Sequence, residues 1–502
     1  MYCIGIDSGT QGTKALLVDF KGRVRGRGYF PHRMVEGLQP GESEQDPGIW
    51  VEALEAALRS ALRQARVNPR EVVSLGISGQ QHGFVPLGEN GRTIRPAKLW
   101  NDTSTLEETE MIVRRLGGKK KFIRKLGITL AVGYTASKIL WMKRHEPRHY
   151  ARLKTVLLPH NYLNFFLTGT AAMEYGDASG TGLMDIRNRV WHKEAVAAIQ
   201  PALRLKLPPL RHPAEPLGLV KKGIAARYGL GRVLVASGGG DNMMAAIGSG
   251  NVVPGFCTAS LGTSGTIFSY LREPFVDPEG EIAAFCDSTG GWLPLLCTMN
   301  VTNATTHFKA LLGLTNKALE ALACRAPAGS GGLLFLPFID GERVPALPDA
   351  SAVFFGLNRR TFSAPYLARA IMEGTILNLG YGFARMRSLG LKPAEVRATG
   401  GGAGSRLWLQ VMADVFQTPV VTLDEQEAAA YGAALQSIWA YELDRGKDAD
   451  IATIVAERVR RKPRPVEPRA GNAALYRSLQ DRFNSLWRSL GGEFKAHRAS
   501  FG

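Results

Sequence analysis

The chain has 502 residues, of which 45% are hydrophobic and 21% are charged. This composition is typical of globular proteins and excludes collagen-like, low-complexity and largely disordered chains, and the length favours two large domains over one. The 62 Lys and Arg residues outnumber the 44 Asp and Glu residues, which gives a formal net charge of +18. This charge favours anionic partners, whether nucleic acid, acidic lipid or phosphorylated metabolites.

The five cysteines form no CxxC pair, which argues against a zinc ribbon and is typical of a reducing compartment. The first residues show no basic segment followed by a cleavage site. No apolar run reaches the roughly 18 residues that a membrane-spanning helix needs. We therefore expect a cytoplasmic protein that does not bind membranes.

The chain begins with the pattern of a β-hairpin. Apolar residues predict strands over residues 2–7 and 14–19, and Gly9-Thr10-Gln11-Gly12-Thr13 lies in the turn between them. Backbone N–H groups and hydroxyls of such a turn can approach phosphate oxygens without obstruction by side chains. The spacing differs from the P-loop pattern GxxxxGK[ST], so a phosphate site here would be of another kind, and an ordinary tight turn is the alternative.

Helix and strand signals alternate after this hairpin, as they do in α/β folds. Apolar residues at helical spacing predict a helix over residues 50–65, a buried strand is predicted over 72–77, and a glycine turn follows at 78–83. The Lys- and Arg-rich stretch 114–125 contains a single aromatic residue, Phe122. We interpret it as the solvated face of a helix and not as an anion site.

Two short segments in this region are candidates for ligand binding. His82, in the glycine turn, is interpreted as a hydrogen-bonding residue of a polar pocket, with a satisfied loop histidine as the alternative. Trp100-Asn101-Asp102 places an aromatic face beside an amide and a carboxylate, a combination that binds polyols. The same three residues also suit an ordinary turn.

Two carboxylates lie at or just after the ends of predicted strands. Asp241 comes after a buried strand over 233–236 and three glycines, so a ligand can approach it and its carboxylate can accept a hydroxyl proton. The alternative is N-capping of the helix predicted over 243–248. Asp7 is a hard oxygen ligand suited to Mg²⁺, with a turn-capping residue as the alternative.

The second half of the chain echoes the first. The echoes pair residues 9–13 with 262–266, residues 72–79 with 396–402, and residues 245–248 with 428–433. Three matches in the same order predict a duplicated domain, and two copies of the Gly-Thr turn would suit a polyphosphate. A proline- and arginine-rich stretch at 458–469 is interpreted as an exposed linker, and residues 475–490 as an amphipathic helix.

Ten short segments between residue 4 and about residue 440 form a recognisable series. They are residues 4–14, 43–47, 78–83, 100–103, 135–141, 240–242, 260–265, 341–343, 400–403 and 427–434. In this order they resemble the motifs of the FGGY family of carbohydrate kinases, and within it those of the xylulokinases most.

The resemblance implies an α/β fold of two RNase H-like domains, of the actin, hexokinase and Hsp70 type, around a deep interdomain cleft. It implies that residues 1–242 bind the sugar and carry the first phosphate turn, and that residues 243–502 bind ATP. The resemblance does not imply how the C-terminal tail, after about residue 440, packs. The activity implied is ATP-dependent phosphorylation of a ketopentose, D-xylulose giving D-xylulose 5-phosphate, with Mg²⁺ and ATP required.

The resemblance also assigns roles to individual residues. Asp241 corresponds to the general base and Asp7 to the residue that organises Mg²⁺, in agreement with their chemistry. The sugar-binding candidates are Gln81, His82 and Asn242 by resemblance, and Trp100, Asn101 and Asp102 by their chemistry. The ATP-binding candidates are Thr10, Gln11, Gly12, Thr13, Lys14, Gly262, Thr263, Ser264, Gly401, Gly402 and Ala403.

Two segments depart from the family's pattern. Gln81 stands where xylulokinases commonly have Met, so an amide that can hydrogen-bond replaces an apolar wall. A sugar other than D-xylulose therefore stays open as the substrate that accepts the phosphoryl group. Residues 285–289 also differ from the common pattern. The contacts that the resemblance implies for the second domain therefore do not extend to this segment, whereas the catalytic residues are not affected.

Three alternatives stay open. The first is an FGGY kinase that acts on another ketose or polyol, such as ribulose, fuculose or a glycerol-like compound. The second is an actin-like ATPase without sugar kinase activity. The third, prompted by the net charge of +18, is a nucleic-acid binder, although the sequence has no zinc-ligand spacing and no RNP-like aromatic motif. We expect a sugar and ATP as partners and no nucleic acid, and a homodimer is possible.

Overall fold

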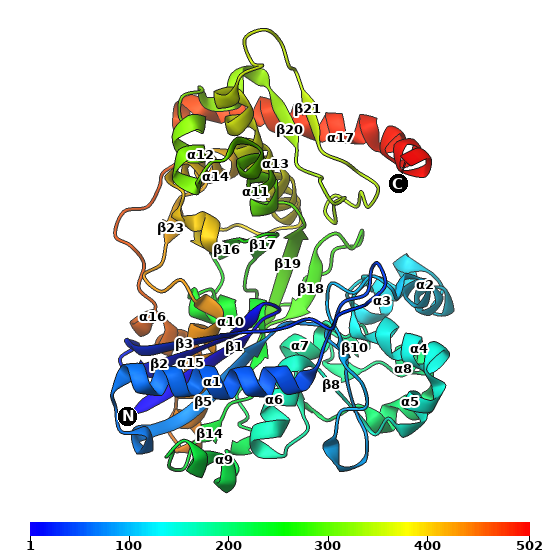
Figure 1. Ribbon diagram of the computed structural model, residues 1–502, viewed down its shortest axis with the longest axis vertical. Coiled ribbons are helices and arrows are strands. Elements are labelled where there is room, and N and C mark those ends of the chain that lie inside the picture. The colour runs from blue at the N-terminus through cyan, green and yellow to red at the C-terminus, as the bar shows by residue number, and fades with distance from the viewer. Residues whose placement is uncertain (502) are drawn as a thin grey trace. The chain divides into compact units, whose positions relative to one another are not determined.

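The computed structural model describes residues 1–501, which form two compact units (Figure 1). Unit 1 consists of Met1–Val253, Tyr270–Pro294 and Glu427–Val459, and unit 2 consists of Pro254–Ser269, Leu295–Gln426 and the residues from Arg460 onward. Each unit is therefore built from three separate stretches of chain, whereas the sequence suggested one boundary after residue 242.

Unit 1 contains most of the short elements of the fold. Its helices are α1 (Pro47–Ala65), α2 (Leu106–Arg115), α3 (Lys119–Leu126), α4 (Thr135–His145), α5 (Pro147–Arg152), α6 (Pro159–Thr168), α7 (Tyr175–Ser179), α8 (Lys193–Ile199), α9 (Lys222–Arg227), α10 (Asp241–Gly248), α15 (Ala428–Asp444) and α16 (Ile451–Arg458). The strands of its main sheet are β1 (Tyr2–Ser8), β2 (Gly12–Asp19), β3 (Val24–Pro31), β5 (Val72–Gly79), β13 (Gly218–Leu219), β14 (Leu234–Val235) and β15 (Gly239–Gly240). The remaining strands are β4 (Glu44–Gln45), β6 (Val85–Leu87), β7 (Ala97–Lys98), β8 (Thr155–Leu157), β9 (Met173–Glu174), β10 (Met184–Asp185), β11 (Val190–Trp191), β12 (Leu210–Arg211) and β18 (Ala283–Cys286).

The main sheet of unit 1 has the strand order β13-β14-β5-β1-β2-β3, and β15 also pairs with β5. β1 and β2 form the predicted N-terminal hairpin, in which Ser8 lies opposite Thr13. β1 and β15 both run parallel to β5. Because parallel strands end at the same edge of a sheet, the residues that follow these three strands are brought together there, where ligands of such sheets bind.

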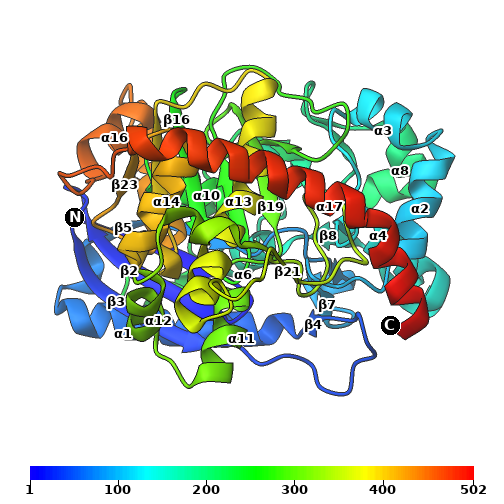
Figure 2. The ribbon, with the colours of Figure 1, turned by 90° about the horizontal axis from the view of Figure 1, so that it is seen from above.

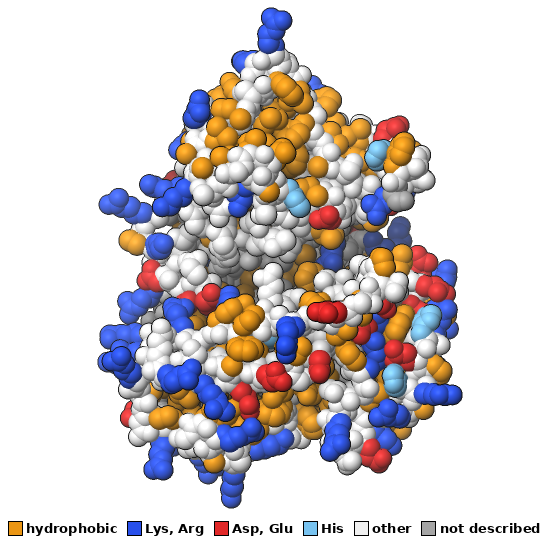
Figure 3. Space-filling view, in the orientation of Figure 1, with side chains coloured by type: hydrophobic (Ala, Val, Ile, Leu, Met, Phe, Trp, Pro, Cys, Tyr) orange, Lys and Arg blue, Asp and Glu red, His pale blue; other side chains and the backbone are white. Residues whose placement is uncertain are grey.

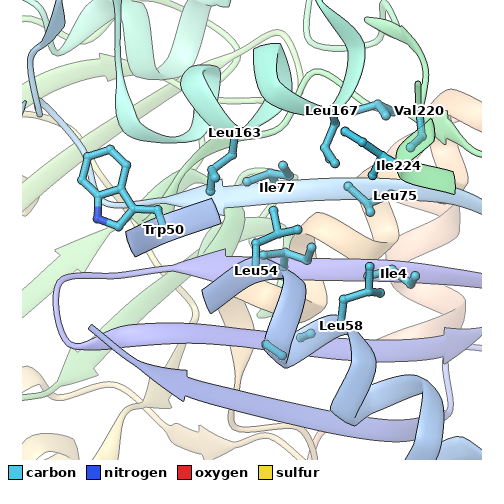
Figure 4. Packing of buried hydrophobic residues seen from close by; sticks show 14 of the residues in the cluster. Ile4, Trp50, Leu54, Leu58, Leu75, Ile77, Leu163, Leu167, Val220 and Ile224 are labelled. Atoms are coloured by element: carbon cyan, nitrogen blue, oxygen red, sulfur yellow. The ribbon is translucent and has the colours of Figure 1, made fainter. Parts of the chain in front are cut away.

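Helix α1 covers one face of this sheet. Asp46 caps its start by accepting a hydrogen bond from a backbone N–H of the first turn. Trp50, Leu54 and Leu58 recur at every fourth position and are buried in one cluster with Ile4 of β1 (Figure 4). The helix predicted over residues 50–65 is confirmed.

The opposite face of the same sheet is covered by α15 and α16. Cys3, Leu16 and Val18 of β1 and β2 point to this face and are buried against residues of these helices. Side chains alternate between the two faces of a strand, so one short hairpin supplies apolar residues to both layers. The result is a sheet with helices on both faces, as the alternating pattern of the sequence indicated.

Unit 2 is built around a second sheet. Its helices are α11 (Thr302–Leu312), α12 (Asn316–Ala323), α13 (Ala364–Ser388), α14 (Arg406–Phe416) and α17 (Ala473–Phe501), and two of its 3₁₀ turns are η4 (Ala328–Gly332) and η5 (Gly401–Gly404). Its strands are β16 (Phe256–Leu261), β17 (Gly265–Phe268), β20 (Leu334–Leu336), β21 (Val353–Phe355), β22 (Glu395–Thr399) and β23 (Val420–Thr422), together with the end of β19 (Trp292–Thr298). The long terminal helix α17 contains the predicted amphipathic helix and contacts α13 and α14 (Figure 2).

The two main sheets repeat one topology. Each starts with a hairpin, β1–β2 in unit 1 and β16–β17 in unit 2. A third strand, β3 or β19, pairs antiparallel with the second strand of the hairpin. Two parallel strands, β5 and β14 or β22 and β23, extend the sheet from the first strand. The orders β14-β5-β1-β2-β3 and β23-β22-β16-β17-β19 therefore correspond, and the duplication predicted from the sequence is present in the fold.

The surface gives two further observations. On the face shown in Figure 3, Lys and Arg side chains are spread over much of the surface, with Asp and Glu side chains between them. Within residues 1–501, no helix combines the length and the apolar character needed to cross a membrane.

Candidate active site

Three strands of unit 1 bring two predicted functional carboxylates to one edge of the sheet. In the paired registers, Asp7 of β1 and Gly239 of β15 both lie opposite Ser78 of β5. Ser78 Oγ donates a hydrogen bond of 2.7 Å to Asp7 Oδ1. Asp241 begins α10 directly after β15. Segments that are far apart in the sequence thus place Asp7 and Asp241 in one electrostatic environment.

Asp241 has the environment of a general base. Its Oδ1 accepts hydrogen bonds from the backbone N and from Nδ2 of Asn242, at 2.8 and 2.9 Å, whereas its Oδ2 accepts none from residues 1–501. Burial, followed by the negative charge of Asp7, raises the pKa of Asp241 to about 7. A carboxylate with this pKa and one free oxygen can take a proton from a hydroxyl group near neutral pH.

Asp7 is the candidate ligand for a metal ion. Burial raises the pKa of its carboxyl group, while Ser78 and the charge of Lys14 oppose this shift. Its Oδ2 accepts no hydrogen bond from residues 1–501, and within those residues no three His, Cys, Asp or Glu side chains are grouped to hold a metal. Mg²⁺ in phosphoryl-transfer sites typically uses one or two carboxylates, water and substrate phosphates, so a single carboxylate with a free oxygen fits this ion.

Gln81 and Asn242 form a polar pair beside Asp241. Asn242 Nδ2 donates to Gln81 Oε1 over 3.0 Å. Gln81 is only 5% exposed, and its Nε2 has no hydrogen-bond partner among residues 1–501. A buried N–H group without an acceptor is unfavourable, which makes this amide available to an oxygen of a ligand.

His82 lies in an aromatic stack. Its ring centroid is 4.4 Å from that of Tyr134 and 5.6 Å from that of Phe285. A Cβ atom added to Gly180 would lie 2.4 Å from the His82 ring, so the ring is closely packed on that side too. Residues 285–289 belong to unit 1.

The motif at residues 135–141 holds the backbone of His82 in place. Lys138 Nζ donates to the carbonyl oxygens of His82 and Gly133, over 2.8 and 2.5 Å, and Thr135 Oγ1 donates to the His82 carbonyl over 3.1 Å. Lys138 is fully buried, and burial lowers its pKa to about 7. These contacts fix a loop in which His82 has a φ of +62°, a region that non-glycine residues rarely adopt.

The structure gives Asp102 a structural role. The side chain is fully buried. Its Oδ2 accepts hydrogen bonds from Ser43 N and Lys98 Nζ, each over 3.0 Å, and its Oδ1 accepts one from Ser104 Oγ over 2.5 Å. Because protein donors occupy both oxygens, the prediction that Asp102 binds a polyol finds no support in its contacts. The neighbouring Asn101 is exposed.

The first Gly-Thr turn is held by side chains of other segments. Gly9 N donates to Gly12 O over 3.1 Å and closes the turn. Thr10 Oγ1 donates to Gln80 Oε1 and accepts from Trp100 Nε1, each over 3.0 Å. The indole of Trp100 is thus engaged in fixing the turn, a contact that the composition of its segment did not indicate.

The other predicted phosphate ligands of this turn differ in accessibility. Gln11 is exposed. Thr13 is fully buried, and its hydroxyl lies 2.9 Å from His32 Nε2. Lys14 Nζ donates to Glu427 over 2.5 Å, and the Lys14 side chain remains 40% exposed. The side chain of Thr13 is therefore turned inward, while Gln11 and Lys14 stay accessible to a ligand.

In unit 2, the parallel pairing of β16 with β22 brings two predicted nucleotide-binding segments together. A hydrogen bond of 3.0 Å from Gly262 N to Ser264 O closes the turn after β16. The turn η5, Gly401–Gly404, follows β22. A Cβ atom added to Gly402 would lie 2.7 Å from the Cβ of Leu261, so the two segments are in close contact. Both are rich in glycine, and backbone N–H groups in such turns suit phosphate.

Several residues of the site were not assigned a role from the sequence. Ser78 fixes Asp7, Phe285 and Tyr134 enclose His82, and Lys138 holds its backbone. Phe285 is separated from His82 by about two hundred residues of sequence, and no local pattern marks such a contact. The segments around Ser78, Tyr134 and Lys138 did carry a signal, because they adjoin or belong to the motif series.

Comparison with known proteins agrees with this arrangement. Residues 2–248 match the N-terminal domain of the FGGY family of carbohydrate kinases, and residues 257–441 match the C-terminal domain of that family. A xylulose kinase of Haemophilus influenzae is 44% identical over 448 residues, which are 88% of this chain and 90% of that protein. A xylulose kinase of Escherichia coli is 32% identical over 497 residues, 98% of this chain and 99% of that protein.

Solved structures agree as well. The crystal structure of a xyloylose kinase from Brucella ovis is 30% identical in sequence and superimposes with a TM-score of 0.91, covering 98% of this chain and 100% of that one. The expected α/β fold of two RNase H-like domains is confirmed. The chain therefore belongs to the FGGY family of carbohydrate kinases.

Proposed function

We propose that this enzyme transfers the γ-phosphoryl group of ATP to D-xylulose and forms D-xylulose 5-phosphate. The observation that carries the proposal is that Asp241 has a free carboxylate oxygen beside the amides of Gln81 and Asn242. The pKa of this carboxyl group is raised to about 7. Support for the sugar comes from relatives named xylulose kinases, which are up to 44% identical across most of the chain.

Asp241 is proposed to act as the general base. Its Oδ2 takes the proton of the acceptor hydroxyl as the hydroxyl oxygen bonds to the γ-phosphorus, and the bond from that phosphorus to ADP breaks. Oδ2 is the oxygen for this task because Asn242 already occupies Oδ1. Phosphoryl transfer needs mainly positioning and neutralisation of charge, so one base and fixed phosphate contacts are sufficient protein machinery.

Asp7 is proposed to hold Mg²⁺ through its free Oδ2, while Ser78 keeps the carboxylate in place through Oδ1. When bound, Mg²⁺ supplies charge neutralisation at the phosphate oxygens. The glycine-rich segments 9–13, 262–264 and 401–403 are proposed to bind ATP through their backbone N–H groups.

The sugar is proposed to supply the hydrogen-bond acceptor that Gln81 Nε2 lacks. His82, stacked with Tyr134 and Phe285, adds an aromatic wall with a polar edge, which is the mixture of surfaces that sugar pockets present. The amide of Gln81 selects sugars that have an oxygen at this point, and a substrate without such an oxygen would leave the amide unpaired.

A sugar panel tests the proposal. ADP release is measured with D-xylulose, D-ribulose, L-fuculose and glycerol, and we expect the highest kcat/KM with D-xylulose. A higher kcat/KM for one of the other acceptors would overturn the choice of substrate. ATP turnover that no sugar stimulates would instead favour an actin-like ATPase without kinase activity.

The raised pKa of Asp241 predicts a pH dependence. A general base works only when it is ionised, and the carboxyl group of Asp241 ionises as the pH rises through about 7. We therefore expect kcat to increase from pH 5.5 to a plateau above about pH 8, one pH unit beyond that pKa. Measurement of kcat at saturating ATP and D-xylulose checks this, and a profile that is flat across neutral pH contradicts the assignment.

Lys138→Met is expected to weaken sugar binding. The substitution removes the donor that holds the His82 and Gly133 carbonyl oxygens, so we expect KM for D-xylulose to rise on the order of tenfold while KM for ATP stays unchanged. Lys143→Met is the matched control, because Lys143 lies on the same helix and donates to Ile199 O over 2.7 Å, away from His82. Equal KM values for D-xylulose in the two variants would show that Lys138 does not position His82.

A further inference from the structure

A buried carboxylate in unit 2 has no part in the reaction described so far. Glu342, in the Gly-Glu-Arg motif, is 2% exposed. Its Oε1 accepts hydrogen bonds from Met299 N and Arg343 N, over 2.7 and 2.8 Å, and its Oε2 accepts from Asn378 Nδ2 and Asn300 Nδ2, over 2.8 and 3.2 Å. All four partners are donors, so an acceptor-only carboxylate suits this position.

The segment that this carboxylate holds also binds the nucleotide turn. Val301 N donates to Thr263 O and Thr302 N donates to Gly262 O, each over 3.0 Å. Both carbonyl oxygens are thus fixed by the backbone that follows β19. The position of the turn depends on where residues 299–302 lie.

Asn300 ties this segment to the motif a second time. Its Nδ2 also donates to the carbonyl oxygen of Gly341 over 2.7 Å, and its Oδ1 accepts from Asn303 Nδ2 over 3.0 Å. Asn378, the remaining side-chain partner, is fully buried in the long helix α13. One carboxylate therefore connects α13 and the motif to the backbone that carries the turn.

The burial of this charge is unfavourable in itself. Burial raises the pKa of Glu342 to about 7 in spite of its four donors. An apolar side chain of similar size would fill the same space without this desolvation. An apolar side chain could not, however, accept the hydrogen bonds from Met299 N and Asn300 Nδ2.

From these contacts we propose that Glu342 is a positioning residue, which sets the turn Gly262–Ser264 for the ATP phosphates through residues 299–302. The inference rests on the nucleotide-binding function proposed above for this turn. Glu342 itself touches no substrate in this arrangement. Its loss would leave the N–H groups of the turn less well ordered for phosphate, whereas the sugar-binding residues of unit 1 would keep their contacts.

The test measures nucleotide binding and kinetics of the full-length enzyme. For Glu342→Ala we expect the Kd for ADP, determined by calorimetry without sugar, and the KM for ATP to rise about tenfold or more. The KM for D-xylulose should stay within about twofold. Glu342→Gln keeps one oxygen that can accept from residues 299 and 343, so it should recover part of the affinity. The affinity for ADP should therefore decrease from the wild type to Glu342→Gln to Glu342→Ala. This order is not expected if Glu342 only stabilises the fold.

Glu373→Ala is the matched control. Glu373 is also 2% exposed and lies in unit 2, where it accepts from Arg369 Nε, Tyr476 Oη and Gly329 N at 2.6, 2.7 and 3.0 Å. It has no link to the nucleotide turn, so we expect a lower Tm with an unchanged Kd for ADP. Equal effects of the two Ala variants on that Kd, or no effect of Glu342→Ala, would overturn the inference.

Two further outcomes are informative. A wild-type enzyme that binds no ADP or phosphorylates no sugar would refute the proposed function itself, which separates that failure from failure of the inference. If Glu342→Ala does not fold, Asn300→Ala takes its place, because it keeps the carboxylate but breaks its side-chain link to the segment. The Kd for ADP should again rise, and an unchanged Kd would contradict the positioning role.

Discussion

The Asp241→Asn enzyme is expected to fold normally and to lose turnover by a factor on the order of 10² to 10⁴, the usual contribution of a general base. Asparagine has the size of aspartate and keeps an oxygen for the hydrogen bonds from Asn242, but its amide cannot take a proton. Sugar-dependent release of ADP at saturating substrates measures the loss in kcat. The affinity for ADP should remain that of the wild type.

Asp185→Asn serves as the control for this experiment. Asp185 is a buried carboxylate of unit 1 whose Oδ1 accepts from Arg187 N and whose Oδ2 accepts from Asn188 Nδ2. Both of its oxygens are satisfied by the protein, and we expect kcat within a few-fold of the wild type. If Asp241→Asn keeps a kcat similar to that of the control, another group accepts the proton.

The second large effect concerns the packing of α10 against α15. The two helices contact each other through glycines, since a Cβ atom on Gly432 would lie 1.8 Å from Met244 O and one on Gly248 would lie 1.9 Å from Ala428 O. Gly432→Ala must therefore push the helices apart, although Ala is the better helix former by about 1 kcal/mol. We expect the free energy of unfolding to fall by about 3 kcal/mol, the upper part of the range for overpacked cores.

Gly492→Ala separates this steric effect from helix propensity. Gly492 also lies within a helix, α17, but nothing would come within 4 Å of its Cβ atom. Here we expect stability to increase by roughly 0.5 to 1 kcal/mol. Thermal unfolding of both full-length variants gives the comparison. A Tm for Gly432→Ala equal to or above that of the wild type would mean that the helices can separate without cost.

Much of the fold and the two carboxylates of the site could be predicted from the sequence. The hairpins around residues 9–13 and 262–266 are local structures, because the glycines and flanking strands that form them are adjacent in the chain. The same holds for Asp7, which is the last but one residue of β1, and for Asp241, which follows β15 directly. The order of such local patterns was enough to indicate a duplicated α/β fold and the carbohydrate kinase family.

Other features depended on contacts between distant segments and could not be read from local patterns. Asp102 looked like a polyol ligand, yet Lys98 and Ser43 surround it once β7 pairs with β4. The unusual pattern at residues 285–289 is visible in the sequence, but the stacking of Phe285 on His82 is not. A residue type shows which hydrogen bonds a side chain can make, but not which partners the fold brings to it.

The sequence by itself determined the family, the duplicated hairpins and the acidic residues at the ends of strands, because each of these depends on residues that are close together in the chain. Only the tertiary structure decided how those groups behave. Burial beside Asp7 raises the pKa of Asp241 to about 7, and burial does the same for Glu342, which holds the backbone behind the turn at 262–264. Desolvation and long-range contacts exist only after the chain has folded, and they set both the proton affinity and the position of each functional group.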